Sequence, residues 1–519
     1  MKYSLALSVA LLLGVSALQP ASAQDRQPAQ NPADLVKAAV EAQGGADALR
    51  ALKGAVIKGE AKHWEPGQSF AVDGESRLID NATFTLTADA VNRMVRIDWD
   101  RDKKYPAVER SKYSEIITPS FGVVVDDKGV QPMSGVRLAA HQREVGRASP
   151  LLMLRALENA QAVTALDPQK AGERSLPAVA FDSGQTKYII LFDPQTHLPA
   201  VVRSRDNDHI YGDSSYDLVL DDWRKVGNVQ IAHALSLQIN GMEVQRLKYN
   251  EVSPNPTIAP DTFAVSDEVK AKAKSAATDV PYQWVLRRMF LGRFLDSDKV
   301  YYPDNGGFKL VELAPNVQQV VGGSANNLIV AMSDGIVVFD APVDEGQSRW
   351  VMDAAKAKYP GKPIKTLVLT HHHMDHTGGM RAYVAEGATV IVPTPSKAYF
   401  ERVVQAPHTL APDTLQKQPK QANIVEVSDR MALKDDSVEI QLYNIPNPHS
   451  DGMIIGHVVK DNVVWVTDIW SPGRDSARTP GVLALGEAVK KLGISGATFA
   501  GGHGTSAKQS TLDGIVAQN

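Results

Sequence analysis

The first half of the chain alternates apolar and polar residues in the manner of β-strands. Ile97 and Trp99 are separated by charged residues, which is the period of a half-buried strand. Asn240-Gly241 stands between two alternating runs and is a strong hairpin signal. We therefore predict a mostly antiparallel, β-rich N-terminal domain over residues 31–265.

Helical patterns come before these strands. Asn31 can cap a first helix, Pro32 suits its first turn, and Gly44-Gly45 ends it. A short second helix is expected over residues 46–52. The layout resembles the curved half-barrel of periplasmic lipoprotein carriers. That resemblance implies binding of an acyl chain or another apolar ligand, and the alternative is a domain that only shields its partner domain.

A connecting segment is expected over residues 266–307. Three prolines between Ser253 and Phe263 close the β-rich region, and a lysine-rich stretch follows. Residues 283–295 are more apolar and predict a helix that packs between the two domains. The domain boundary is placed near residues 302–307.

The last region, residues 308–519, predicts a mixed domain. Four short apolar runs come first, and a helix is expected at about residues 344–358. Strands and helices then alternate to the end of the chain. This order predicts an α+β fold in which two packed sheets carry helices on both outer faces.

The first residues, 1–23, have the pattern of a secretory signal peptide. Lys2 supplies the positive charge, residues 5–18 are apolar, and Ala21-Ser22-Ala23 is a small-residue cleavage site. A polar spacer, residues 24–30, follows. We expect a periplasmic or secreted protein without a membrane span after cleavage; the alternative is an uncleaved anchor.

Composition narrows the chemistry. Hydrophobic content of 43% and charged content of 22% are ordinary for a soluble protein. The net charge of -4 and the pI of about 6.4 give no reason to expect a nucleic-acid partner. The chain has no cysteine, so any metal site must use nitrogen and oxygen ligands. We expect a small-molecule substrate, and the sequence leaves the oligomeric state open.

The most unusual stretch is THHHMDHTGG, residues 370–379. It follows a predicted buried strand, and sites in α/β folds gather at the carboxyl ends of strands. His371 and His373 point to the same side of an extended segment, whereas His372 points away. Asp375 and His376 follow as the chain turns into a helix.

Three further candidates follow later strands in loops rich in Gly, Pro or Ser. They are His449, Asp468 and His503. Zinc needs three or four nitrogen or oxygen ligands, and a catalytic site keeps one position for water. Together with the first cluster these side chains form a candidate metal centre.

This set of motifs resembles the metallo-β-lactamase superfamily over residues 308–519. The resemblance implies an αββα sandwich with two metal ions, which are zinc, or else iron or manganese. It implies that His371, His373 and His449 hold the first ion. It also implies that Asp375, His376 and His503 hold the second ion, and that Asp468 bridges the two. We expect His372 to support these ligands without binding metal.

The implied reaction is hydrolysis. A hydroxide shared by two metals attacks a carbonyl of an ester, lactone, thioester or amide, and Asp375 orients the nucleophile or carries its proton. Cleavage of a phosphoester or a sulfate ester is possible with the same ligands. Asp468 argues against β-lactamases that place cysteine or a serine-like residue there, but β-lactamase-type amide hydrolysis stays an alternative. Lactonases that cleave acyl-homoserine lactones use a tyrosine between the bridging Asp and the last His, and none occurs between Asp468 and His503.

A second alternative is a protein that binds an acyl chain or lipid and carries a structural or redox metal site. An open coordination position on each ion would favour the enzyme. Substrate contacts are expected from the loop after Asp468, because an arginine there can hold a carboxylate. The candidates are Trp470, Ser471, Arg474 and Arg478, with His408 from a loop that could overhang the site.

Overall fold

The computed structural model describes residues 31–184, 186–276, 287, 307–323 and 325–518. The predicted signal peptide, residues 1–23, and the spacer, residues 24–30, lie outside this part of the chain. The packing helix predicted at residues 283–295 also lies outside it, with the exception of Arg287.

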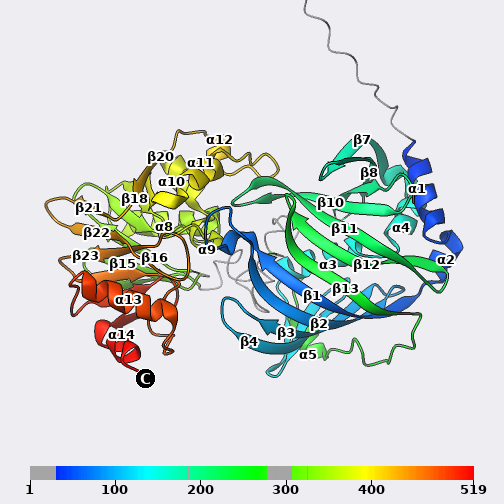
Figure 1. Cartoon of the computed structure of the whole chain (residues 1–519), viewed down its shortest axis with the longest axis horizontal. Helices are drawn as coiled ribbons and strands as arrows, with labels where there is room; N and C mark the ends of the chain where they lie inside the picture. Colours follow the sequence, from blue (N-terminus) through cyan, green and yellow to red (C-terminus); the bar gives the residue numbers. More distant parts are fainter. Residues whose placement is uncertain (1–30, 185, 277–286, 288–306, 324, 519) are drawn as a thin grey trace, which may run out of the picture.

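All strands before residue 255 in the described part of the chain belong to one antiparallel sheet. Its strand order is β6-β5-β4-β3-β2-β1-β13-β12-β11-β10-β9-β8-β7. Figure 1 shows it as a curved layer on one side of the molecule. Its strands are β1 Gly54–Glu65, β2 Arg77–Asp89, β3 Met94–Lys103, β4 Glu109–Ile117, β5 Gly122–Asp126, β6 Gly129–Pro132, β7 Val163–Ala171, β8 Arg174–Asp182, β9 Lys187–Phe192, β10 Pro199–Asp208, β11 Gly212–Val226, β12 Val229–Ile239 and β13 Met242–Pro254.

The predicted hairpin is confirmed between β12 and β13. Ile239 pairs with Met242, so Asn240 and Gly241 form a two-residue turn. Both residues have positive φ, 48° and 87°, which this tight turn requires and which Asn and Gly tolerate. The alternation around Ile97 is likewise a strand, β3.

The helices of this half are α1 Pro32–Ala42, α2 Ala46–Ala51, α3 Gly135–Arg147, α4 Leu152–Glu158 and α5 Asp267–Lys272, with short 3-10 turns η1 Pro66–Gln68 and η2 Ala160–Ala162. Helices α1, α2 and α4 pack on one face of the sheet, where Val36, Leu49 and Leu152 meet Phe181 and Ile231. The mostly antiparallel, β-rich prediction is confirmed, but helices α3 and α4 were not predicted within it. These helices stand between β6 and β7, and their pattern was masked because Arg137 and Arg147 of α3 are buried.

The second half contains two sheets. The first has the order β14-β15-β16-β17-β18-β19-β20 and the second β21-β22-β23-β24-β25-β26. Their strands are β14 Lys309–Ala314, β15 Val317–Val321, β16 Asn327–Ala331, β17 Ile336–Phe339, β18 Ile364–Val368, β19 Thr389–Pro393, β20 Asn423–Val427, β21 Arg430–Lys434, β22 Glu439–Asn444, β23 Ile454–Val458, β24 Val463–Val466, β25 Thr498–Gly501 and β26 Ser506–Lys508.

The predicted αββα sandwich is confirmed. Side chains such as Phe339 and Val368 of one sheet pack on Ile440 and Trp465 of the other. The outer faces carry helices α8 Glu345–Lys358, α9 Met374–Thr377, α10 Met380–Glu386, α11 Lys397–Gln405, α12 Thr414–Lys417, α13 Pro480–Lys491 and α14 Gln509–Val516, and the 3-10 turn η3 Thr394–Ser396. Helices α8, α10 and α11 cover the first sheet, and α13 and α14 cover the second.

The two halves are in direct contact. One cluster of buried apolar residues runs from the curved sheet into the sandwich. Backbone hydrogen bonds also cross the junction, from Asp213 N to Pro407 O (2.7 Å) and from Asp451 N to Phe70 O (2.6 Å). Among the described residues, no helix combines the length and the hydropathy that a membrane crossing requires.

Candidate metal centre

Strand ends bring the candidate ligands together. His371 and His373 follow β18, and Asp375 and His376 lie on α9, which begins directly after them. The three remaining candidates follow other strands: His449 comes after β22, Asp468 after β24, and His503 after β25. Strands β24 and β25 are parallel, so their carboxyl ends meet at one edge of the sheet.

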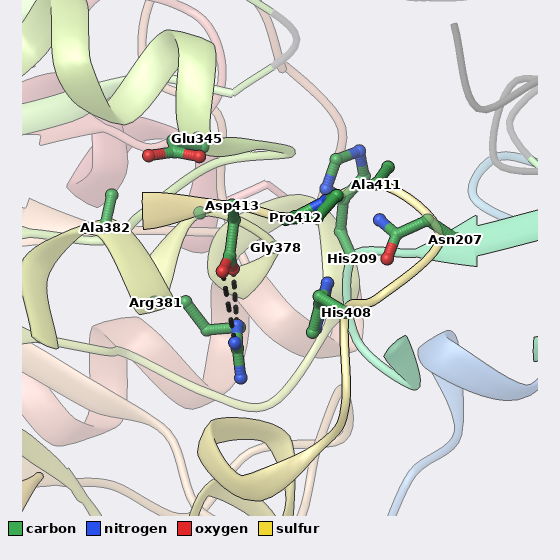
Figure 2. A pocket seen from close by; sticks show the side chains of 11 residues that line it. Asn207, His209, Glu345, Gly378, Arg381, Ala382, His408, Ala411, Pro412 and Asp413 are labelled. Atoms are coloured by element: carbon green, nitrogen blue, oxygen red, sulfur yellow. Dashed lines mark hydrogen bonds and ion pairs between the residues drawn. The ribbon is translucent and has the colours of Figure 1, made fainter. Parts of the chain in front are cut away.

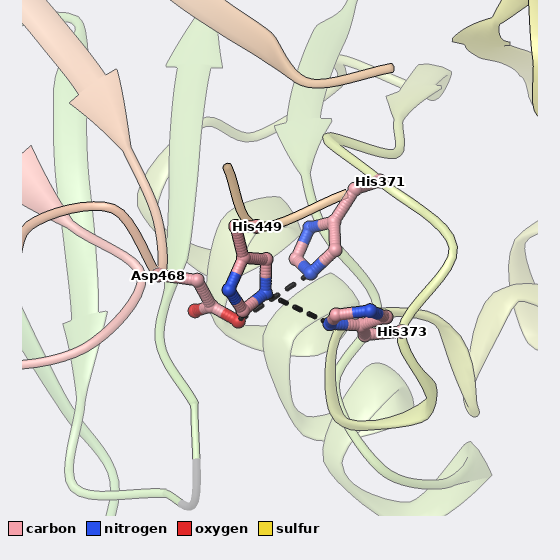
Figure 3. A group of neighbouring side chains, drawn as sticks. All are labelled: His371, His373, His449 and Asp468. Atoms are coloured by element: carbon pink, nitrogen blue, oxygen red, sulfur yellow. Dashed lines mark hydrogen bonds and ion pairs between the residues drawn. The ribbon is translucent and has the colours of Figure 1, made fainter. Parts of the chain in front are cut away.

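The first group comprises His371, His373, His449 and Asp468, as Figure 3 shows. One ligand atom from each of them lies within 4.8 Å of the others. His449 Nε2 is 2.8 Å from His373 Nδ1 and 3.0 Å from Asp468 Oδ2. Two ring nitrogens that face each other beside a carboxylate are the donor set that a divalent metal uses.

The second group comprises Asp375, His376, His503 and Asp468. The Nε2 atoms of His376 and His503 are 3.2 Å apart. Asp375 Oδ2 lies 3.7 Å from each of these two nitrogens. The second group is therefore as convergent as the first.

Asp468 belongs to both groups through different oxygens. Its Oδ2 faces His449, and its Oδ1 is 3.0 Å from both His376 Nε2 and His503 Nε2. Asp468 has a φ of 60°, a left-handed conformation that non-glycine residues adopt rarely and that clusters at functional sites. The backbone thus directs one carboxylate between two sets of imidazoles.

The electrostatics differ between the groups. Burial lowers the pKa of His371 to about 4 and the pKa of His373 well below its ordinary value, so both rings are neutral at pH 7. Burial also disfavours the charged form of His376 and His503. The carboxylates of Asp468 and Asp375 nevertheless raise the pKa of both imidazoles, that of His503 to about 9. Burial would raise the pKa of Asp468, yet the imidazoles hold it well below its usual range.

An unpaired nitrogen supports a metal in the first group. His371 Nε2 is buried and has no hydrogen-bond partner, while Asp468 Oδ2 lies 3.4 Å away. A buried polar atom without a partner is costly. A cation held between these atoms would satisfy it, and neutral imidazole is the form that binds metal.

Asp340 supports the site from behind. It is fully buried at the end of β17, and its Oδ1 accepts hydrogen bonds from the backbone N and the hydroxyl of Thr370. Its Oδ2 lies 3.3 Å from His376 Nδ1. A carboxylate behind a ligating histidine fixes the ring orientation and leaves Nε2 directed at the metal.

The N-terminal domain also reaches the centre. Gln68 Nε2 donates to Asp375 Oδ1 at 2.5 Å, and Ser69 O lies 2.8 Å from His373 Nε2. The hydroxyl of Tyr105 donates to Gln68 Oε1. Arg77 donates to the backbone oxygen of His449 at 2.9 Å. No sequence motif predicts these four residues, and only the Pro66-Gly67 turn before Gln68 marks a loop there.

His372 lies outside both groups. It is buried, its ring contacts those of His373 and Tyr399, and its Nε2 is 3.5 Å from Ser69 Oγ. Burial lowers its pKa to about 3. This placement agrees with the prediction that His372 packs beside the ligands without joining them.

The loop after Asp468 is placed differently from expectation. Trp470 is 1% exposed, and its ring packs on Phe499 in the core under α13. This burial argues against the substrate contact predicted for Trp470. Ser471 is also buried, and its hydroxyl accepts a hydrogen bond from Arg474.

Two arginines of this loop have local partners. Arg474 is exposed and pairs with Asp475 at 3.2 Å, and Arg478 donates to the backbone oxygen of Val516 on α14. Both arginines are exposed.

His408 lines a separate cavity of about 270 Å³, shown in Figure 2. Asn207 and His209 of the N-terminal half face it, with the Arg381–Asp413 ion pair on the other side. Burial and the charge of Arg381 lower the pKa of His408 to about 4. None of the seven candidate ligands lines this cavity, so the prediction that His408 overhangs the metal centre is not supported by its position.

Comparison with known proteins gives partial matches to two enzymes. A linear primary-alkylsulfatase from Pseudomonas sp is 33% identical over 78 residues, which are 15% of this chain and 12% of that protein. An (R)-specific secondary-alkylsulfatase from Pseudomonas sp is 35% identical over 78 residues, with the same shares. The match thus spans only 12% of the length of either relative.

The solved structures that match part of the chain are more distant in sequence. A metallo-beta-lactamase from Pontibacter korlensis is 14% identical with a TM-score of 0.33, and the superposition covers 40% of this chain and 97% of that one. A metallo-beta-lactamase from Hirschia baltica is 19% identical with a TM-score of 0.32, covering 40% and 96%.

A family-wide sequence comparison covers the whole candidate centre. The sequence model of the metallo-beta-lactamase superfamily matches residues 321–504. That range includes every residue of both groups, from His371 to His503. The region of this chain that carries the candidate metal centre, residues 321–504, is therefore similar to the metallo-beta-lactamase superfamily.

Proposed function

We propose that this chain is an exported hydrolase that uses two metal ions to cleave a carbonyl ester or a related lactone, thioester or amide. The observation that carries the proposal is the position of Asp468, which directs one oxygen into each ligand group. Ligands that are all imidazole or carboxylate suit zinc, and also iron or manganese. Bound ions would supply Lewis acidity and lower the pKa of water toward 7.

The residues of the chain have separable roles in this proposal. His371, His373 and His449 hold the first ion, and His376 and His503 hold the second together with Asp375. The Gln68 amide occupies Asp375 Oδ1, which leaves Oδ2 directed into the centre. That oxygen can orient the attacking water and accept its proton.

A second candidate reaction is hydrolysis of an alkyl sulfate ester. The two partial relatives are named as alkylsulfatases, and this similarity favours sulfate esters over phosphoesters. The ligand groups serve either reaction, because both require an electrophile held beside an activated water. Cleavage of a β-lactam amide stays within the proposed class.

The test combines metal analysis with a substrate panel. The mature protein is loaded with zinc and assayed with p-nitrophenyl butyrate, an aliphatic lactone, a chromogenic cephalosporin and dodecyl sulfate. Asp468→Ala is the blank, and Asp513→Ala, at an exposed position of α14, is the matched control. Turnover by the wild type and by Asp513→Ala, but not by Asp468→Ala, is expected for one bond class. A protein with two zinc ions that turns over none of these, yet binds lipid, would favour the carrier alternative.

Export is part of the proposal and rests on the charged, apolar and small-residue pattern of residues 1–23. Edman sequencing of protein from the periplasmic or secreted fraction should begin at Gln24. A full-length chain that starts at Met1 and sediments with membranes would contradict cleavage and support the anchor.

A further inference from the structure

A second cavity, of about 130 Å³, lies in the N-terminal half against the curved sheet. Strands on both sides of β1 and helix α3 form its walls, and none of the seven candidate metal ligands lines it. Most of the wall is aromatic or aliphatic, from Phe84, Ile97, Trp99, Leu218, Leu235 and Leu247. An apolar cavity with a few convergent polar groups is the usual form of a small-molecule site.

Part of the cavity wall is polar. Arg137 of α3 donates from Nη2 to Glu115 Oε1 at 2.7 Å. Its Nε and Nη1 atoms are buried without a hydrogen-bond partner, although the residue is only 2% exposed. Native structures rarely leave buried donors unsatisfied, so each such group calls for an explanation. An acceptor atom of a bound molecule would provide one.

The ionised side chains that line the cavity all have partners of opposite charge. Arg137 is paired with Glu115, Arg101 with Asp80, and Glu144 with Arg147. Burial disfavours the ionised form of Glu115, but His141 and Arg137 hold the pKa of this carboxyl well below its ordinary value, so the pair is complete at neutral pH. A further buried charge would have no counter-ion here. An uncharged ligand therefore fits better than a carboxylate or an ammonium.

We propose that this cavity binds an uncharged molecule that consists of one compact apolar group and one carbonyl oxygen. The apolar group lies against Phe84, Trp99 and Leu235, and the oxygen accepts hydrogen bonds from Arg137. The volume sets the size, because a dry cavity of about 150 Å³ accommodates benzene. This site is independent of the proposed hydrolase function.

The test is isothermal titration calorimetry of the mature protein with cyclohexanone, cyclohexanecarboxylate and cyclohexylammonium. Cyclohexanone should bind with one-to-one stoichiometry and at least about tenfold more tightly than either charged probe, which is a difference of about 1.4 kcal/mol. Asp468→Ala should bind cyclohexanone equally well, which separates this cavity from the metal centre and from failure of the hydrolase proposal.

Two alanines give a matched pair of variants. Ala148, at the end of α3, lines the cavity, whereas Ala517, at the end of α14, is exposed. Ala148→Leu should weaken cyclohexanone binding at least tenfold and Ala517→Leu should leave it unchanged. Arg137→Gln, which keeps a donor near Glu115, should also weaken it.

Any of three results would overturn the proposal. The wild type fails to bind cyclohexanone at millimolar concentration, Ala148→Leu binds cyclohexanone as tightly as the wild type does, or cyclohexanecarboxylate binds more tightly than cyclohexanone.

Discussion

Asp468 shows how one residue links two metal sites. Its left-handed backbone turns the carboxylate away from β24, so that its two oxygens meet imidazoles of different groups. A side chain without a carboxylate at this position leaves four imidazoles with nothing between them. The dependence of both groups on one residue leads to the first prediction.

Asp468→Ala should lower the metal content of the zinc-loaded protein from about two ions per chain to about one or fewer. Inductively coupled plasma mass spectrometry measures the content, and circular dichroism checks the fold. Asp513→Ala should keep both ions. Retention of two ions by Asp468→Ala would contradict the bridging role.

Gln68 acts on the second group through Asp375. Gln68→Ala removes the donor to Asp375 Oδ1, so the carboxylate loses its fixed orientation. Loss of such an outer partner costs about 10-fold to 100-fold in metal affinity. Chelator competition should show weaker binding of one zinc ion while the other is unchanged.

Two variants sharpen this experiment. Tyr105→Phe, which removes the hydroxyl bonded to Gln68, should have a smaller effect in the same direction. Gln161→Ala, at an exposed position in η2, should have none. Equal loss of both zinc ions in Gln68→Ala would refute an effect specific to the second group.

The sequence predicted the residues of the two groups better than their partners. His371 to His376 share one motif, and the later three follow recognisable strands. Gln68 could not be predicted, because it meets Asp375 across 307 positions of sequence and belongs to no motif. The burial of Trp470 could not be predicted either, because its position beside Asp468 in the sequence does not show that its ring packs on Phe499 and the core under α13.

At the scale of elements, the turn between α9 and α10 fixes the position of α9, which carries Asp375 and His376. Gly379 packs so closely on α8 that an added Cβ atom would overlap Ser348 Oγ and the backbone oxygen of Asp344. Gly378 is equally close to the backbone of Val343. These approaches fix the direction in which α9 presents Asp375 and His376.

Gly379→Ala should therefore destabilise the protein by about 1–3 kcal/mol, the usual cost of overpacking. Gly514→Ala is the matched control, because no atom lies within 4 Å of an added Cβ there. Alanine in the exposed helix α14 should stabilise it by about 0.5–1 kcal/mol. Urea unfolding measures the free energy of unfolding of both variants. Equal stability of the two would show that the chain around Gly379 can make room for a Cβ atom.

Element prediction succeeded where the pattern was local. The Asn240-Gly241 hairpin and strand β3 carry their signals within a few residues. Helix α3 carries no such local signal. Residues 136–140 are all buried and include Arg137, so the sequence shows no apolar stripe of helical period. Tertiary contacts with Glu115 make that arginine an interior residue.

At the scale of the whole molecule, buried ion pairs connect distant segments. Arg287 contacts both Glu65 at the end of β1 and Asp208 at the end of β10, and its guanidinium lies 3.5 Å from Met374 Sδ beside the metal centre. Asp80 and Arg101 form a similar pair within the sheet. The stability of the molecule therefore depends on carboxylates that must stay ionised.

Acid should destabilise the protein through these carboxylates. Burial would raise the pKa values of Asp80, Glu115 and Asp208, but their cationic partners hold all three below the ordinary values of 3.8 to 4.5. A lowered pKa in the folded state gives stability that is complete above the unfolded value and is lost as the pH falls. Urea midpoints should begin to fall below about pH 6.5, because the buried imidazoles of His371, His372 and His408 gain a proton only on unfolding. The fall should steepen below about pH 4.5, where the unfolded carboxylates bind protons.

Glu115→Gln tests the origin of this slope. It should cost about 3–5 kcal/mol at pH 7, because it breaks a buried pair and leaves Arg137 charged. Its urea midpoint should then depend less on pH between 5 and 3 than that of the wild type. An unchanged pH slope would assign the acid sensitivity to other carboxylates.

The loop from Glu65 to Arg77 has a consequence for recombination. Its residues bond to Asp375, His373 and His449, although the superfamily match begins only at residue 321. A chimera that exchanges the sandwich alone would inherit ligands without the groups that orient them. The unit that can be transplanted intact is the sandwich together with this loop and the strands β1 and β2 that hold it.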